Sequence, residues 1–369
     1  MSLTSSAAAS AASSPDSRRR AQPPAIGVVG VGALGRHHAR VVRDLEGVSH
    51  AGVFDVERPR CRAVAAELGV EEQASLTELL EAADAVVIAV PTSGHEAVAM
   101  DAIRAGVHVF VEKPMAASLE AADRMIEAAA DRDVLIQVGH VERFNPVLAA
   151  ARPHLDRPLF VESHRLSPFT RRSLDVAVVL DLMIHDVDLL CSLIGSPVVR
   201  MAATGVPVLT RHVDIANARL EFEGGAVANL TASRVSVTGV RKLRVWQRSG
   251  YLSLDLAGGR GEFFRLREGV SLLEGSGLAG HVSSSAGDVS AAAGDVSVPA
   301  GLSSIVERIP ITGDGTEPLM AELASFRDAL LGLAPPPVTG EDGRTALRLA
   351  LAIQQQIEDH VANTRAAAS

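Results

Sequence analysis

The chain has 369 residues, of which 47% are hydrophobic and only 3% aromatic, so two or three domains with cores of Ala, Val and Leu are expected. The formal net charge of −9, without a long basic block, argues against nucleic acid as the main partner. The sequence contains no run of about 18 uninterrupted apolar residues, so no membrane span is predicted. Cys61 and Cys191 lack metal-like or redox spacing, so we expect a cytoplasmic protein.

The first 24 residues are rich in Ser and Ala and end at two prolines. Such a composition predicts a disordered N-terminal extension. A cleaved targeting sequence is the less favoured alternative, because the basic cluster Arg18-Arg19-Arg20 follows the small residues and no apolar signal core is present.

A dinucleotide-binding pattern follows this extension. The apolar run 26–29 predicts a buried strand, three glycines then stand in G-x-G-x-x-G spacing, a helix over 36–45 comes next, and a second strand ends in an acid. The helix N-terminus offers free N–H groups to phosphates, and the acid can bind the ribose hydroxyls. The cofactor-binding residues predicted here are Gly30, Gly32, Ala33, Leu34, Gly35 and Asp55.

Asp55 also bears on which dinucleotide binds. Its carboxylate would repel a 2′-phosphate, so NAD is favoured over NADP. Arg58 and Arg60 lie just beyond and offer a way to offset that repulsion, although solvated positions are the simpler interpretation.

Residues 25–145 alternate between strand-like and helix-like segments, which predicts a doubly wound parallel sheet, a Rossmann domain, with its ligand at the carboxyl ends of the strands. The predicted strands are 26–29, 51–55, 85–90, 108–111 and 135–138. The predicted helices are 36–45, 60–68, 76–82, 95–105 and 119–131.

The texture changes in residues 146–365, where we predict a second, substrate-binding and oligomerisation domain of α+β class with a large, mostly antiparallel open sheet. A helix over 175–194 precedes the clearest strands, 216–223, 226–235, 242–247 and 250–255. Gly224-Gly225 predicts a hairpin turn, and two amphipathic helices, 317–331 and 340–363, close the chain. Residues 276–302 form a low-complexity insert with a short internal echo, too weak for a calcium-binding repeat.

Two clusters carry candidate catalytic groups. Lys113 directly follows the strand 108–111, where an ammonium can hydrogen-bond a substrate hydroxyl and stabilise developing negative charge. Asp181 and His185 stand at i, i+4, so the carboxylate can orient an imidazole that takes a hydroxyl proton. A metal site of Asp181, His185 and Asp188 is a minor alternative, because no further ligand has matching spacing, and we predict no metal.

Arginine and asparagine residues near the expected domain junction are candidates for reading polar or anionic substrate groups, with structural or solvated roles as the alternative. They are Arg143, Asn145, Arg165, Arg171 and Arg172.

Taken together, the glycine turn, Val90-Pro91-Thr92 with His95, the triplet Glu112-Lys113-Pro114, and Asp181 with His185 resemble the glucose–fructose oxidoreductase / inositol dehydrogenase / MocA-type family. The resemblance implies a Rossmann domain followed by a domain whose open sheet often forms a subunit interface. It implies Lys113, Asp181 and His185 as the catalytic set, with either lysine or histidine moving the proton. It adds Pro91, Thr92, His95 and Glu112 to the cofactor-binding residues.

Within that family, segments 138–146 and 179–186 are most similar to enzymes that oxidise the 3-hydroxyl of UDP-N-acetylglucosamine for lipid A or surface polysaccharide. The expected protein is therefore an NAD-dependent sugar or nucleotide-sugar dehydrogenase, a homodimer or homotetramer without nucleic-acid or membrane partners. A free-sugar or inositol dehydrogenase and a catalytically silent NAD-binding regulator are the alternatives.

Overall fold

The structure is a computed structural model that describes residues 23–170, 176–267 and 305–368. Within it the chain forms two compact units that are not continuous in sequence. Unit 1 comprises residues up to 112, then 120–139 and 323–340; unit 2 comprises 113–119, 140–322 and the residues from 341 onward. The expected N-terminal extension, apart from its last two residues, and the insert 276–302 lie outside the described residues.

Unit 1 is built on a five-stranded sheet in the order β2-β1-β3-β4-β5, with every neighbouring pair parallel. This confirms the predicted doubly wound sheet. The strands are β1 (Ala25–Val29), β2 (Ser49–Phe54), β3 (Ala85–Ile88), β4 (His108–Glu112) and β5 (Ile136–Gly139). The helices between them are α2 (Ala33–Asp44), α3 (Arg58–Leu68), α4 (Leu76–Ala82), η1 (Thr92–Gly94), α5 (His95–Arg104) and α6 (Leu119–Asp131).

A C-terminal segment also belongs to unit 1. It contains most of α9 (Pro318–Leu330), whose Phe326 is fully buried and packs edge-on against Phe110 of β4 at 5.6 Å between ring centroids. The backbone N–H of Val138 in β5 then donates to the carbonyl of Val338 at 3.1 Å. Residues 323–340 therefore help to complete the nucleotide-binding fold.

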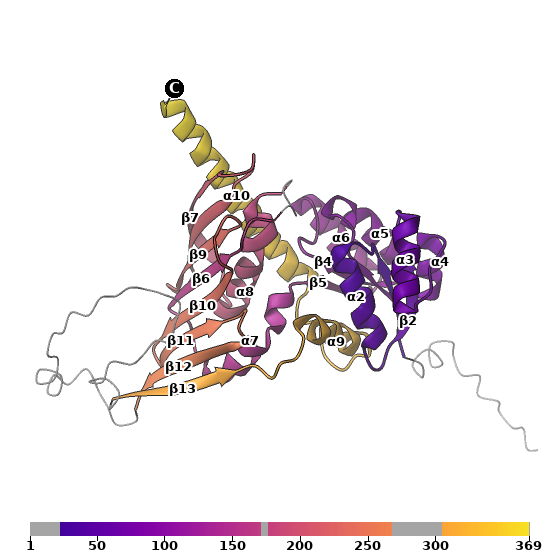
Figure 1. Ribbon diagram of the computed structural model, residues 1–369, viewed down its shortest axis with the longest axis horizontal. Coiled ribbons are helices and arrows are strands. Elements are labelled where there is room, and N and C mark those ends of the chain that lie inside the picture. The colour runs from indigo at the N-terminus through magenta and orange to yellow at the C-terminus, as the bar shows by residue number, and fades with distance from the viewer. Residues whose placement is uncertain (1–22, 171–175, 268–304, 369) are drawn as a thin grey trace, which may run out of the picture. The chain divides into compact units, whose positions relative to one another are not determined.

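Unit 2 is built on an eight-stranded sheet in the order β13-β12-β11-β10-β6-β9-β8-β7, antiparallel except for the parallel pair β6–β9 (Figure 1). This confirms the mostly antiparallel open sheet. The strands are β6 (Phe160–Leu166), β7 (Val198–Val206), β8 (Ile215–Phe222), β9 (Val227–Ser233), β10 (Val240–Gln247), β11 (Gly250–Asp255), β12 (Arg260–Leu266) and β13 (Val306–Thr312). Gly224 and Gly225, both at φ +90°, make the predicted turn between β8 and β9.

The helical elements of unit 2 include one apolar helix, α8, that packs on this sheet. In full they are η2 (Val141–Phe144), α7 (Pro146–Ala151), η3 (Arg152–His154), the π-helical turn η4 (Val179–Met183), α8 (Ile184–Ile194) and most of α10 (Gly340–Ala368). The predicted helix over 175–194 is thus divided into a π-turn and α8, and its first residue lies outside the described range.

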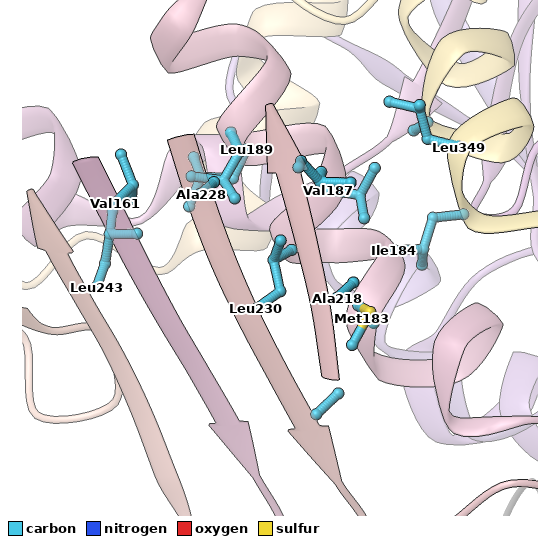
Figure 2. Close-up of a cluster of buried hydrophobic side chains, with 14 of the residues drawn as sticks. Val161, Met183, Ile184, Val187, Leu189, Ala218, Ala228, Leu230, Leu243 and Leu349 are labelled. Carbon is cyan, nitrogen blue, oxygen red and sulfur yellow. The ribbon is translucent and has the colours of Figure 1, made fainter. Parts of the chain in front are cut away.

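The core of unit 2 lies between α8 and the inward face of the sheet. Val187 and Leu189 of α8 face Ala218, Ala228 and Leu230 of the strands, and all five are buried (Figure 2). Small residues on the strands let the helix approach closely, and burying apolar area of this kind is the main stabilising term. Helix α8, which contains His185 in its first turn, is therefore held against the sheet.

Candidate functional site

The glycine turn of unit 1 has the geometry of a phosphate cradle. Gly30 has φ +85°, which favours glycine, and its N–H donates to Phe54 O at 2.8 Å. A Cβ on Gly35 would come within 1.7 Å of the Gly30 carbonyl oxygen, whereas a Cβ on Gly32 would meet nothing within 4 Å. No side chain caps α2 at Gly32, so the N–H groups of its first turn, including those of Ala33 and Leu34, suit an anionic ligand.

Asp55 follows β2 and is almost fully buried. It accepts hydrogen bonds from the N–H groups of Val31 and Glu57, each at 2.8 Å, and from Arg60 Nη2 at 2.6 Å. Burial alone would raise the pKa of Asp55, but Arg60 and the two N–H groups outweigh it and hold that pKa below its ordinary value. Arg58 instead donates to Gln73 O at 2.7 Å, so Arg60 is the cation that contacts Asp55, the acid predicted to bind the ribose.

The remaining predicted cofactor residues lie after β3 and at the end of β4. Pro91 and Thr92 open the 3₁₀ turn η1, and His95 Nε2 lies 2.9 Å from Val90 O, which fixes the ring. Glu112 is the last residue of β4, and its carboxylate lies 2.7 Å from His38 Nε2.

Sequence reasoning missed His38, although a signal was present. Gly35, His38, Ala39 and Val42 share the buried face of α2, and a histidine among them needs a polar partner. Glu112 is that partner.

Unit 2 brings Lys113, Asp181 and His185 together. Lys113 Nζ donates to the backbone carbonyl of Asp181 at 2.7 Å, in the π-turn that leads into α8. Burial, followed by the charges of Lys113 and Arg165, lowers the pKa of His185 well below its ordinary value. The imidazole is therefore neutral at pH 7 and able to accept a proton.

The expected hydrogen bond between Asp181 and His185 is not formed. His185 Nδ1 is buried and has no hydrogen-bond partner among the described residues. The reason is the π-turn over Val179–Met183, whose wider i→i+5 geometry changes the angular relation that an α-helix would give residues four apart. The lysine reaches the Asp181 peptide carbonyl instead.

Two candidate substrate residues have internal partners. Arg143 binds Asp188 with Nε at 2.7 Å and Nη2 at 2.6 Å, and it lies 3.5 Å from Asp342. Asn145 caps α7 through the Val147 N–H and donates to Leu256 O at 2.9 Å. Both side chains therefore hold the fold in this structure.

Arg165 is likewise engaged inside unit 2. Its guanidinium meets Asp186 and Glu142, at 2.8 Å from Nε and 2.7 Å from Nη1 respectively. Arg171 and Arg172 lie outside the described residues.

His140 is a second residue that sequence reasoning passed over. It is buried directly after β5, and its ring lies edge-on to His185 with centroids 6.5 Å apart and planes at 89°. Within the described residues, no group of three or more His, Cys, Asp or Glu side chains is arranged to hold a metal ion. None of the described helices combines the length and apolar character that crossing a membrane requires.

Comparison with known proteins adds a family context. Residues 25–140 match the model of an oxidoreductase family with an NAD-binding Rossmann fold, and residues 147–253 match the GFO/IDH/MocA C-terminal domain. The UDP-N-acetylglucosamine 3-dehydrogenase of Acidithiobacillus ferrooxidans is 42% identical over 230 residues, 62% of this chain and 73% of that protein. The scyllo-inositol 2-dehydrogenase (NAD(+)) of Bacillus subtilis is 32% identical over 231 residues, 58% of this chain and 68% of that protein.

A solved structure agrees over a larger share of the chain. UDP-N-acetylglucosamine 3-dehydrogenase from Acidithiobacillus ferrooxidans matches with a TM-score of 0.78 and 33% identity, covering 91% of this chain and 98% of that one.

Proposed function

This chain belongs to the GFO/IDH/MocA oxidoreductase family, as its motifs predict, and on that premise we propose that it oxidises the 3-hydroxyl of a UDP-N-acetyl-hexosamine with NAD. The observation that carries the chemistry is a buried His185, whose pKa is lowered by burial and by the charge of Lys113, together with the Lys113 Nζ hydrogen bond to the Asp181 carbonyl. Its product would be a UDP-3-oxo sugar for lipid A or surface polysaccharide synthesis. The cytoplasmic location expected from the sequence stays a prediction.

The residues of unit 1 fit a dinucleotide. The space beside Gly32 and the uncapped start of α2 suit a diphosphate, and the ionised Asp55 suits the ribose hydroxyls. Bound NAD supplies a hydride acceptor. Asp55 supports NAD over NADP, while the Arg60 guanidinium on the same carboxylate lessens the repulsion of a 2′-phosphate.

Two residues of unit 2 serve the substrate carbinol in this proposal. The carbinol carbon loses a hydride and its oxygen loses a proton, so a base and a cation are both needed at the oxygen. His185, neutral through burial, takes the proton, and the Lys113 Nζ donates a hydrogen bond to the same oxygen. Lys113 as the base is the alternative, in which its neutral amine would take the hydroxyl proton in place of His185.

The choice of a UDP-sugar follows from the 42% identical relative, and an inositol or free sugar from the 32% identical one. We expect turnover of UDP-N-acetylglucosamine or UDP-N-acetylgalactosamine, read as NADH absorbance, and none of myo-inositol, scyllo-inositol or glucose. NADP in place of NAD completes the panel. Turnover of an inositol and of neither UDP-sugar would favour the alternative function, that of an inositol dehydrogenase.

Lys113→Ala is the matched variant in that panel. Removing one acid–base group commonly lowers the rate about 10²–10⁴-fold. NADH binding, measured by fluorescence titration, should stay as in the wild type. NADH binding without turnover of any carbinol by the wild type would instead favour the silent-regulator alternative.

A homodimer or homotetramer is part of the proposal and is supported by the outward sheet face of unit 2. Phe160, Trp246, Tyr251 and Phe264 stand in register across β6, β10, β11 and β12, with successive ring centroids 5.2, 4.9 and 5.8 Å apart. The chain's only tryptophan and only tyrosine are in this row. Phe160, Trp246 and Tyr251 are partly exposed while Phe264 is buried, and partly exposed aromatic rings favour burial against a second copy of the same sheet.

A further inference from the structure

Arg165 of β6 connects two buried carboxylates. Nε and Nη2 donate to the Asp186 carboxylate at 2.8 and 3.0 Å, and Nη1 donates to Glu142 at 2.7 Å. Ser163, two residues earlier on the same strand face, adds a hydrogen bond to Asp186 at 2.9 Å. Arg165 is only 5% exposed, and all three nitrogens of its guanidinium donate to carboxylates inside the protein.

Each of the two carboxylates lies close in sequence to a histidine. Asp186 directly follows His185 in α8, and Glu142 of η2 lies two residues after His140, which precedes η2 as its N-cap. The bidentate pair Arg143–Asp188 joins the same two elements a second time. The backbone of α8 is thus fixed at positions 186 and 188, immediately beyond His185.

This fixation matters because the His185 ring has little else to orient it. Nδ1 accepts no hydrogen bond among the described residues, and the Asp181 carboxylate, which the sequence suggested as its partner, does not reach it. The position of the imidazole therefore follows from the α8 backbone and from its edge-on contact with His140.

We propose that Arg165 is a positioning residue, which holds the imidazole of His185 in its productive place by locking Asp186 to Glu142. The inference rests on the proposed role of His185. It replaces the sequence-based expectation that Arg165 reads the substrate.

The charges around Arg165 are balanced for this task. One guanidinium faces two carboxylates, and Arg241 supplies a second cation 3.3 Å from Glu142. Burial alone would raise the pKa of Glu142, but Arg165 and Arg241 hold it below its ordinary value, so the network is ionic. A planar guanidinium can bind both carboxylates at once. A lysine ammonium carries the same charge but lacks the planar arrangement of several N–H donors.

Two variants separate position from charge. In Arg165→Lys the charge stays and the geometry changes, so we expect kcat to fall about 10²-fold, the loss typical of a misplaced catalytic group, with an unchanged pH profile. In Arg165→Met the positive charge is also lost, so the pKa of His185 rises and the acid limb of kcat moves to higher pH. NADH binding should match the wild type in both variants.

Arg124→Lys is the matched control. It breaks an equally short arginine–carboxylate pair, 2.6 Å from Glu96, on the exposed surface of unit 1. We expect wild-type kcat, pH profile and NADH binding from it.

An NMR spectrum of the imidazole signals reports the environment of the His185 ring independently of enzyme activity. The His185 signal is assigned by its loss in His185→Gln. The signal should move in Arg165→Lys and stay in Arg124→Lys. An unmoved signal or a wild-type kcat in Arg165→Lys would overturn the inference. Should Arg165→Met fail to fold, Ser163→Ala removes one hydrogen bond to Asp186 and should shift the signal less. If the signal moves in Arg165→Lys as expected but the wild type oxidises no substrate, only the proposed function is contradicted.

Discussion

Gly30, Gly32 and Gly35 share one motif, yet each is a glycine for a different physical reason. Gly30 adopts φ +85°, Gly35 has no room for a Cβ against the Gly30 carbonyl, and Gly32 has open space beside it. Two of the three therefore serve the chain's own turn. Only Gly32 is free of such a demand, which is expected where a ligand, and not the protein, occupies the neighbouring volume.

A pair of alanine variants tests this division. Gly35→Ala places a methyl 1.7 Å from a backbone oxygen that cannot move aside, so we expect a loss of stability of about 1–3 kcal/mol or more together with loss of NADH binding. Gly32→Ala should keep the melting temperature and weaken NADH binding at least tenfold. Thermal melts and fluorescence titration measure both. Full NADH affinity in Gly32→Ala would place the diphosphate elsewhere.

At the scale of secondary-structure elements, the return of residues 323–340 to the Rossmann unit stands out. Phe326 has no exposed surface and stacks edge-on with Phe110, which itself packs edge-on with His38 at 5.5 Å. His38 in turn binds Glu112, the residue before Lys113. A helix near the end of the chain therefore supports the strand that ends one residue before the proposed catalytic Lys113.

Phe326→Ala should lower the free energy of unfolding by about 3–5 kcal/mol, because it empties a buried aromatic site. Leu333→Ala, in the same segment but 72% exposed, should change it by less than about 0.5 kcal/mol. Urea denaturation followed by far-UV circular dichroism measures both. Equal effects from the two variants would show that the segment does not stabilise unit 1.

The parallel sheet could be predicted from sequence because each buried strand is a short apolar run between helical segments. Four strands of unit 2, namely β6, β7, β12 and β13, were not predicted. In β6 the inward positions include Ser163 and Arg165, so its alternation looks polar on both faces. The edge strand β13 contains Pro310, and the edge strand β7 exposes Val199, so neither shows a clean hydrophobic alternation.

At the scale of the whole molecule, the glycine turn and Asp55 are local and could be predicted from spacing. Lys113 and the Asp181 carbonyl, which form a hydrogen bond, are 68 residues apart in the sequence. No local sequence pattern predicts such a contact, and only the family resemblance grouped the two residues. The ion pairs of Arg143 and Arg165 have the same character. Their partners on α8 and η2 are fixed by the packing of unit 2, so residue type alone suggested substrate contacts.

At the scale of the whole molecule, the outward aromatic row is where the proposed oligomer can be tested. Trp246→Glu adds a charge to a partly exposed position of the row, so we expect the oligomer to dissociate into folded monomers. Val237→Glu, at a position 97% exposed, should leave the oligomer unchanged. Sedimentation velocity gives the mass of each species, and circular dichroism checks the fold. If the wild type sediments as a monomer, the proposal that the aromatic row forms a subunit interface is wrong.

The discontinuity of unit 1 has a consequence for synthesis of the protein. Domains usually fold in the order in which they leave the ribosome, but this nucleotide-binding unit waits for residues 323–340, which emerge close to the end of translation. By then the whole eight-stranded sheet has been made. A gene truncated after residue 145 would therefore encode an incomplete Rossmann unit with the Phe110 side of its sheet left uncovered.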